Sequence, residues 1–467
     1  MAHYGVPGVA VAIIKNGNVI HAAGYGVTNI ETGATVTEDT VFSVGSVSKM
    51  GAAAASLRLV SRNKLSLDDS VNEQLKSWKI RNTDVADARN VTLRSLLSHT
   101  SGLSVHGFDD FLPGEPLPTV YETLDGTAPK SGGEAVDLLF VPGTSSKYSG
   151  GGTTVIQLLV SDVTGKSFAE AAEELVFKPL EMSRSTYANP LPEDYGNIAY
   201  AHGSDGELVA KPRGYHTFPE AAASGLWTSA SDLARLIIAF QKSHAETNNN
   251  FLPNALARDV MTEVGWSDFG LGPMLIGTGT ERRFFHSGFN DSYKAWWEGH
   301  LFSGNGLVVL TNGMRGFELI VEIRRAIADQ MHWPFYREIS VPGRQLGDVF
   351  SNRFVGTFKL GSQQDLAVFS QRLRTVKAIE AITIESEENG LQMFLTDNPT
   401  KAWNLLPLTD THFLVEGMYL AKTDAHTIEF IRDNSGAVNR VILARNGYQV
   451  EMLRQFDPKP GDMSTPE

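Results

Sequence analysis

The chain has 467 residues and no cysteine, so it forms no disulfide, uses no thiol nucleophile and ligates no metal through cysteine. It also lacks a His-Glu-x-x-His motif and clustered metal ligands, and we therefore expect no metal and no cofactor. Positive charge is scarce, because 40 Lys and Arg face 53 Asp and Glu for a formal net charge of -13. An acidic surface repels nucleic acid and anionic membranes, so a small molecule or short peptide is the expected partner.

The sequence also shows no targeting signal. Its opening residues, Met1-Ala2-His3-Tyr4-Gly5, form no basic and apolar leader, and no apolar run is long enough to span a membrane. As written it is expected to be soluble and cytoplasmic, or exported if a leader was trimmed, and the compartment stays unknown. With 42% hydrophobic residues the chain can build more than one core, and the composition leaves room for a homo-oligomer.

The larger, amino-terminal part mixes strand and helix patterns. Two apolar β-rich runs, 9–14 and 19–25, flank Asn16-Gly17, and such a pattern is typical of a hairpin. Helical patterns occupy the middle and strand patterns return near its end, at 46–60, 155–163, 168–177 and 229–240 for helices, 293–298 and 307–310 for strands, and 317–331 for a last helix. The fold class is therefore α+β, with the two terminal segments pairing in one antiparallel sheet.

After Val341-Pro342-Gly343 the pattern changes to short alternating runs without helical periodicity. The predicted strands are 354–360, 366–369, 378–384, 391–395, 413–415, 427–431, 438–443 and 449–453. So many short strands predict a small all-β sandwich or barrel. We expect two domains, 1–344 and 345–467, and a frayed tail over 459–467.

One motif carries reactive chemistry on its own. Ser46-Val47-Ser48-Lys49 places a hydroxyl and an amine one helical turn apart, just before the apolar, alanine-rich run 50–60. A serine at the positive end of a buried helix, next to a desolvated lysine, suits a nucleophile beside its own base. The pattern is short enough to arise by chance, as Ser61-Arg62-Asn63-Lys64 does at the polar end of the same helix.

Three further segments contain polar side chains that suit a hydrolase. In Leu97-Ser98-His99-Thr100-Ser101-Gly102, a helix end closed by side-chain hydrogen bonds is a better reading than a catalytic triad. Tyr148, on a glycine-rich approach to a helix, is either a partly buried core tyrosine or a proton shuttle beside an ammonium. His286, in His286-Ser287-Gly288-Phe289-Asn290 ahead of the strand pattern at 293–298, is either structural or part of a site.

Their order along the chain, Ser-x-x-Lys, then Tyr, then a basic residue followed by x-Gly, resembles the signature of penicillin-recognising serine hydrolases. This family comprises class C β-lactamases, D-alanyl-D-alanine carboxypeptidases, D-aminopeptidases and related esterases, and the resemblance covers about residues 5–340. Further segments that match are 5–11, 65–69, 99–103, 142–143 and 224–229. The resemblance implies a β-lactamase/transpeptidase-like antiparallel sheet flanked by helices, with a helical subdomain, and a carboxyl-terminal barrel similar to a lipocalin-like appendage.

The resemblance also implies roles for individual residues. Ser46 would be acylated, Lys49 would act as its base, Tyr148 would shuttle the proton, and His286 stands where many members carry lysine. The oxyanion would be held by the backbone N–H groups of Ser46 and of Phe289, the residue after Gly288.

Two departures from the family pattern concern the substrate. Gly150 stands where members often have the asparagine that contacts the substrate's acylamide, and His286-Ser287-Gly288 replaces Lys-Thr-Gly. Both changes remove groups that favour carboxylate-bearing β-lactams. We therefore expect a serine hydrolase acting through an acyl-enzyme on small amides, D-amino-acid-containing peptides or esters. The alternatives are an acyl-transferring cyclase or transesterase, a weak β-lactamase, and a non-catalytic ligand-binding descendant.

Overall fold

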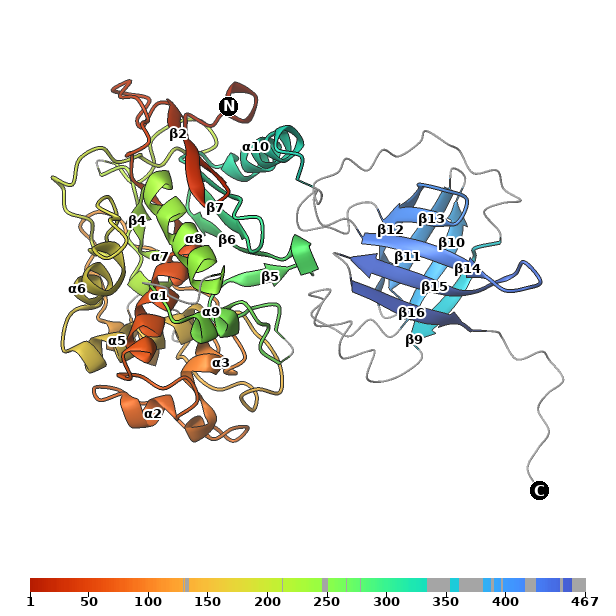
Figure 1. Ribbon diagram of the computed structural model, residues 1–467, viewed down its shortest axis with the longest axis horizontal. Helices are drawn as coiled ribbons and strands as arrows, with labels where there is room; N and C mark the ends of the chain where they lie inside the picture. The colour runs from red at the N-terminus through yellow and green to blue at the C-terminus, as the bar shows by residue number, and fades with distance from the viewer. Residues whose placement is uncertain are drawn as a thin grey trace. The chain divides into compact units, whose positions relative to one another are not determined.

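The computed structural model describes residues 1–128, 130, 134–211, 213–245, 251–265, 267–277, 279–333, 353–360, 381–387, 390–395, 398–415, 426–445 and 448–455. Two compact units make up the chain, Met1–Ile327 and Ala328–Glu467. Figure 1 shows the α+β architecture of the first unit and the all-β architecture of the second. The predicted domain boundary between residues 344 and 345 lies outside the described residues.

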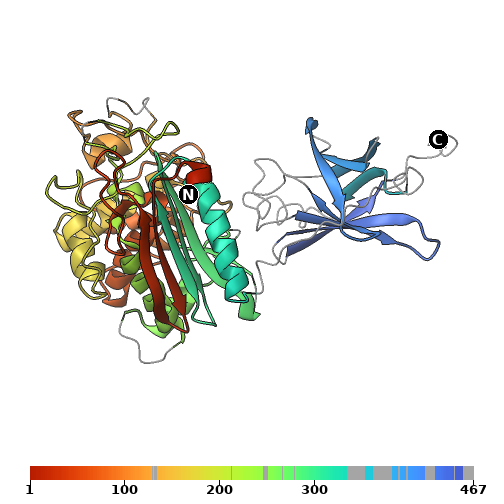
Figure 2. The ribbon, with the colours of Figure 1, turned by 90° about the horizontal axis from the view of Figure 1, so that it is seen from above.

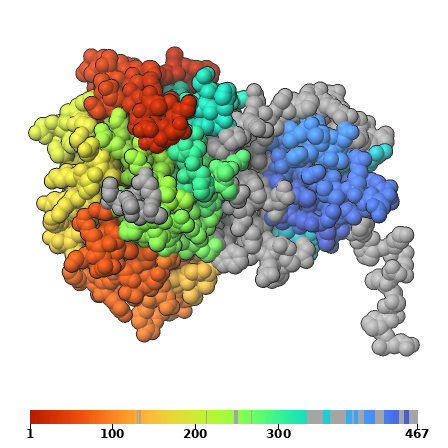
Figure 3. Space-filling model, in the orientation of Figure 1, coloured from red at the N-terminus to blue at the C-terminus, as the bar shows by residue number. Residues whose placement is uncertain are grey.

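The first unit is built on a six-stranded antiparallel sheet. In spatial order its strands are β2 (Asn18–Gly26), β1 (Gly8–Lys15), β8 (Gly306–Thr311), β7 (Tyr293–His300), β6 (Arg283–Asn290) and β5 (Met274–Ile276). The predicted hairpin is therefore confirmed, and β1 pairs directly with β8, with Val9 opposite Thr311. Strands from both ends of the unit share one sheet, as the sequence pattern predicts. The hairpin lies at the surface (red in Figure 3), where the edge strand β2 leaves Val19 and Ile20 exposed.

Helices cover both faces of this sheet. The helix α10 (Gly316–Gln330) lies on one face, and the helices of the central part of the chain lie on the other (Figure 2). On that second face α8 (Ala230–Ala245) packs against β1, β7 and β8, and Leu233 accepts a hydrogen bond of 3.1 Å from the Trp297 indole. Since both faces are covered, every residue of β7 is buried.

The remaining elements form a helical region around α1 (Ser48–Ser61), whose residues are buried almost throughout. These elements are β3 (Phe42–Ser43), α2 (Val71–Gln74), α3 (Leu93–Leu97), α4 (Val120–Asp125), α5 (Gly150–Thr164), α6 (Phe168–Ala172), α7 (Ala221–Ser224), β4 (Trp227–Thr228) and α9 (Asn254–Val260). The helix predicted over 155–163 begins earlier, because the Ser149 side chain accepts the Gly152 N–H and caps α5. The helix predicted over 168–177 continues past α6 as a π-helical turn, Glu173–Phe177.

The second unit contains a closed antiparallel barrel, so the barrel alternative of the sequence analysis is confirmed. Around the barrel run β10 (Ala381–Glu387), β11 (Gly390–Leu395), β12 (Asn398–Pro407), β13 (His412–Val415), β14 (His426–Arg432), β15 (Val438–Arg445), β16 (Tyr448–Arg454) and β9 (Gly356–Leu360). Packed phenylalanines fill its interior, with the Phe430 ring 4.5 Å from Phe354 and 5.4 Å from Phe413. The sequence analysis missed β12, because prolines at 399 and 407 disguise it. The predicted strand 366–369 lies outside the described residues.

Candidate active site

Ser46 lies in a single 3₁₀ turn, Gly45–Val47, that leads directly into α1. The turn is possible because Gly45 takes a left-handed conformation with φ 50°. Ser48 fixes the turn, since its hydroxyl donates to the Gly45 carbonyl at 2.6 Å and accepts the Leu226 N–H at 2.9 Å. Ser46 remains partly exposed at the amino-terminal, electropositive end of α1.

Lys49 lies in the first turn of α1, only 5% exposed. Its Nζ is 3.2 Å from the Ser46 hydroxyl oxygen and donates to the Ala223 carbonyl of α7 at 2.9 Å. The alanines that follow it are buried, so the apolar setting expected from the sequence is present. This arrangement places an amine within direct reach of the serine proton.

Tyr148 lies just before α5, partly exposed, and its ring centroid is 4.9 Å from Lys49 Nζ. Two imidazoles flank it, with ring centroids 4.4 Å away for His99 and 5.0 Å away for His106. His99 is itself fixed, because its Nδ1 accepts the Ser149 N–H at 3.2 Å. The Tyr148 ring is therefore held beside Lys49.

His286 lies inside strand β6, whereas the sequence analysis placed it ahead of a strand. The prediction missed β6 because Ser287, Gly288 and Asn290 weaken the strand pattern. The imidazole is 3% exposed, its Nδ1 lies 2.7 Å from the Ser287 carbonyl, and its ring centroid is 6.1 Å from that of Tyr148. The structure thus brings all four predicted catalytic residues to one locality.

The backbone of β6 packs directly against the turn that carries Ser46. A Cβ on Gly288 would lie 1.9 Å from the Val44 carbonyl oxygen and 3.0 Å from the Ser46 nitrogen. A Cβ on Gly45 would in turn lie 2.5 Å from the Phe289 nitrogen. Only glycines permit this approach, which places the Ser46 and Phe289 amides in adjacent segments, as an oxyanion site requires.

The Phe289 side chain lies away from this contact. Its ring centroid is 5.2 Å from that of Phe317 on α10, and the side chain is 49% exposed. Neighbouring residues of a strand point to opposite faces, so the Phe289 ring lies on the face of the sheet that α10 covers, while its amide lies next to Gly45.

Gly150 is buried at the start of α5, against the loop that carries His106. Its N–H donates to the His106 carbonyl at 3.0 Å, and a Cβ there would lie 2.5 Å from that same oxygen. An asparagine side chain therefore cannot occupy this position unless the loop moves.

We expect Gly150→Asn to destabilise the protein by about 1–3 kcal/mol, because the added side chain overpacks a backbone contact. We also expect no gain in β-lactam turnover. Urea unfolding and hydrolysis of a chromogenic cephalosporin measure the two effects. A stable variant that hydrolyses the cephalosporin much faster would show that the loop adapts readily.

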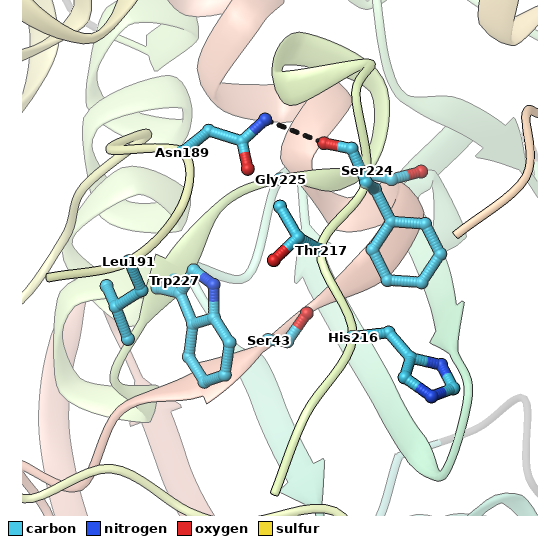
Figure 4. A pocket seen from close by; sticks show the side chains of 9 residues that line it. Ser43, Asn189, Leu191, His216, Thr217, Ser224, Gly225 and Trp227 are labelled. Atoms are coloured by element: carbon cyan, nitrogen blue, oxygen red, sulfur yellow. Dashed lines mark hydrogen bonds between the residues drawn. The ribbon is translucent and has the colours of Figure 1, made fainter. Parts of the chain in front are cut away.

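A small pocket lies next to this site without containing any predicted catalytic residue. It is lined by Ser43, Asn189, Leu191, His216, Thr217, Phe218, Ser224, Gly225 and Trp227 (Figure 4). The Asn189 amide closes one side by donating to the Phe218 carbonyl at 2.7 Å, drawn as a dashed line in Figure 4. Asn290 joins the pocket to β6, because its amide donates to the Ser43 hydroxyl at 2.9 Å and to the Ser224 carbonyl at 2.7 Å.

The two motif-like serines outside the site make local hydrogen bonds. Ser61 donates to the Arg58 carbonyl at 2.8 Å at the far end of α1, and Ser101 accepts the Leu103 N–H at 3.4 Å. Ser98, next to His99, donates to the Arg94 carbonyl at 2.8 Å. This segment is a helix end closed by side-chain hydrogen bonds, as expected.

Sequence reasoning missed two residues next to the predicted ones. His106 is exposed beside Tyr148, and Glu220 is 2% exposed just before α7. Burial raises the pKa of the Glu220 carboxyl to about 7, although the nearby charge of Lys49 lowers it in part. The sequence did contain a signal for Glu220, a single carboxyl at the start of the apolar run 221–223. His106 gave none.

Two searches of the described part of the chain found nothing. Among those residues no group of three or more His, Asp or Glu side chains could hold a metal ion. None of the described helices combines the length and the apolar character needed to cross a membrane.

The chain is similar in sequence to known proteins. The family model described as "Beta-lactamase" matches residues 1–331. Esterase EstB of Burkholderia gladioli is 30% identical over 281 residues, which cover 53% of this chain and 68% of the esterase. Penicillin-binding protein 4 of Amycolatopsis lactamdurans is 32% identical over 209 residues, which cover 44% of this chain and only 51% of that protein.

Solved structures show the same fold over nearly the whole chain. The octameric penicillin-binding protein homologue from Pyrococcus abyssi matches with a TM-score of 0.59 at 20% identity, covering 97% of each chain. SurE, solved with D-Leu, matches with a TM-score of 0.56 at 20% identity, covering 97% of this chain and 96% of that one. EstCE1, described as a hydrolase with promiscuous acyltransferase activity, matches with a TM-score of 0.52 at 21% identity, over 67% of this chain and 90% of its own.

Proposed function

Since this chain belongs to the β-lactamase family of serine hydrolases, we propose that it cleaves small amides, D-residue peptides or esters through an acyl-enzyme on Ser46. The observation that carries the proposal is the 3.2 Å contact between Lys49 Nζ and the Ser46 hydroxyl, beside Tyr148. A non-catalytic binding descendant would not need this serine, lysine and tyrosine together.

In the proposed acylation step, neutral Lys49 takes the Ser46 proton while the serine oxygen attacks the substrate carbonyl. The negative charge on the carbonyl oxygen is stabilised by the Ser46 and Phe289 N–H groups. Tyr148 passes a proton to the leaving group as the bond to that group breaks, and Lys49 returns the proton taken from Ser46 to Tyr148, so both residues regain their starting states. Water then attacks the ester and releases the acid, so Ser46 is regenerated.

The proposed substrate class follows from the side-chain groups with which the site could bind a substrate carboxylate. Gly150 provides no side-chain amide, and His286 provides a titratable imidazole in place of a permanent ammonium. Neutral amides and esters should therefore be processed better than penicillins or D-Ala-D-Ala acids. The esterase among the relatives and the D-Leu named with SurE support the ester and D-residue arms of the proposal.

A test of the proposal is a panel of D- and L-aminoacyl amides, short-chain esters and a chromogenic cephalosporin, with intact-mass detection of the acylated enzyme. We expect turnover of at least one amide or ester and a mass increase located on the tryptic peptide containing Ser46. Absence of any acyl-enzyme across the panel and with a serine-reactive fluorophosphonate would contradict the proposal.

We expect His286→Lys to raise the preference for a carboxylate substrate over its matched neutral amide about tenfold, because it adds a permanent charge. The measurement is the ratio of kcat/KM for the acid and amide in both proteins. His21→Lys, on the exposed edge strand β2, makes the same change away from the site and is the control for a general charge effect. An unchanged ratio, or a wild-type enzyme that already prefers the acid, would show that another group binds the carboxylate.

A second candidate is acyl transfer, in which an amine or alcohol replaces water in deacylation. It is favoured by one finding, the structural likeness to a hydrolase with promiscuous acyltransferase activity. Adding an amine nucleophile to the panel distinguishes the two, because a transferase forms the new amide in competition with the free acid.

We also propose that the hydrolase domain spans 1–344 and that the barrel domain, 345–467, supplies no catalytic group. All four proposed catalytic residues lie within the family match at 1–331. Assembly into a homo-oligomer belongs to the same proposal, supported by the octameric homologue of the same fold.

A further inference from the structure

Glu220 is a buried acid whose backbone supports the contact made by the catalytic lysine. It is 2% exposed, and its carbonyl accepts the N–H groups of Ala223 at 2.9 Å and Ser224 at 3.0 Å. These bonds form the turn α7, and the Ala223 carbonyl of that turn accepts Lys49 Nζ at 2.9 Å. The position of this acid and the position of the lysine amine are therefore linked through one turn of backbone.

The Glu220 carboxyl also touches the loop behind Tyr148. Its Oε1 accepts the Phe108 N–H at 3.4 Å, and its Oε2 is buried with no hydrogen-bond donor among the described residues. The same loop carries His106, whose ring centroid lies 5.0 Å from that of Tyr148. A single carboxyl therefore lies between the elements that hold the proposed base and the proposed proton shuttle.

The charges of Glu220 and Lys49 affect one another. Burial raises the pKa of Glu220 to about 7, the positive charge of Lys49 lowers it, and the negative charge of Asp109 raises it. The attraction between the two charges is mutual, so an ionised Glu220 favours a positive charge on Lys49. The neighbouring side chain from α5, Gln157, is uncharged and accepts the Ala222 N–H at 2.9 Å.

We propose that Glu220 is a positioning residue that sets how readily Lys49 gives up its proton and holds the 106–108 loop behind Tyr148. The inference rests on the proposed function, in which Lys49 must be neutral to accept the Ser46 proton. When Glu220 is ionised it opposes this loss of charge, and when it is protonated it does not. The acid therefore adjusts the pH range in which the base is active.

The test is the pH dependence of Ser46 labelling by a fluorophosphonate, which needs no identified substrate. Glu220→Gln keeps an oxygen acceptor for the Phe108 N–H but removes the charge. We expect the acid limb of its labelling rate to move down by about 0.5–1 pH unit, because a lysine without a nearby carboxylate loses its proton more easily. Asp109→Asn is the control, and its exposed position should give a smaller shift because water screens the charge.

Distinct outcomes separate the inference from the proposed function. Wild-type protein that is not labelled at any pH would overturn the proposed function itself. A labelled wild type with an unmoved acid limb in Glu220→Gln, even at a lower rate, would assign Glu220 a purely structural role and overturn the inference.

A second measurement applies even if Glu220→Gln does not fold. In protein labelled with carbon-13 at the glutamate carboxyls, one glutamate should titrate near neutrality in the wild type. Its midpoint should rise by about 0.5–1 pH unit in Lys49→Met, since the neighbouring positive charge is gone. No glutamate midpoint near neutrality, or one that does not respond to Lys49→Met, would overturn the inference.

Discussion

Ser46→Ala should reduce kcat by at least about a thousandfold and abolish labelling by a fluorophosphonate, because it removes the oxygen that we propose forms the acyl-enzyme. The fold should survive this change. Ser46 is partly exposed, and the turn around it is fixed by Ser48 and Gly45 rather than by the Ser46 hydroxyl. Steady-state kinetics, labelling followed by peptide mapping, and the thermal unfolding midpoint are the measurements.

The chain provides a matched control in its second Ser-x-x-Lys motif. Ser61 lies in the same helix, but its hydroxyl donates to the Arg58 carbonyl at 2.8 Å. Ser61→Ala should therefore leave turnover and labelling close to the wild-type values. A labelled peptide that contains Ser61 or Ser101 in place of Ser46 would contradict the assignment of the nucleophile.

The two Ser-x-x-Lys motifs show why a short motif is informative only within its surroundings. The alanine run after Lys49 contains no polar residue to face solvent, so burial of the first motif could be predicted. Lys64 follows the end of α1 and is exposed, as the polar residues around it indicate. The sequence therefore predicts which of the two lysines is buried.

Four of the six strands of the sheet could be predicted because their pattern is local, whereas β5, β6 and the contacts of the site could not. Apolar β-rich runs on either side of Asn16-Gly17 identify β1 and β2, and the strand patterns at 293–298 and 307–310 identify β7 and β8. No local pattern indicates that Gly288 will pack against Val44, although the two lie in contact in the fold. That contact joins two segments far apart in the sequence and depends on Gly288 having no Cβ.

The sequence places Glu220 next to an apolar run, but its burial could not be predicted, for a related reason. A glutamate at the start of an apolar run is usually exposed at a helix terminus, where it interacts favourably with the helix dipole. The tertiary fold instead covers it with the 106–108 loop, which is 112 residues distant at Phe108. The pKa shift of this residue is thus a property of the folded chain that the sequence does not contain in any local form.

Lys49→Met should lower kcat/KM by about a hundredfold to ten-thousandfold, the range typical of losing a positioned general base. Methionine has nearly the length of lysine and no charge, so it fills the site, which is 5% exposed at Lys49. The thermal unfolding midpoint should therefore change little, because the variant loses the hydrogen bond to Ala223 but no longer buries a polar amine. Lys64→Met, in the exposed second motif, is the matched control and should keep wild-type activity.

The pH dependence of the labelling rate should show whether Lys49→Met is slow because it lacks the general base or because its Ser46 has moved. With Lys49 absent, hydroxide must take the Ser46 proton, and the labelling rate should rise about tenfold per pH unit across the neutral range. A wild-type profile would instead level off once Lys49 is neutral. If Lys49→Met kept a plateau at neutral pH and near wild-type labelling, another group would be the base, and Tyr148, whose ring lies 4.9 Å from Lys49 Nζ, would be the first to replace next.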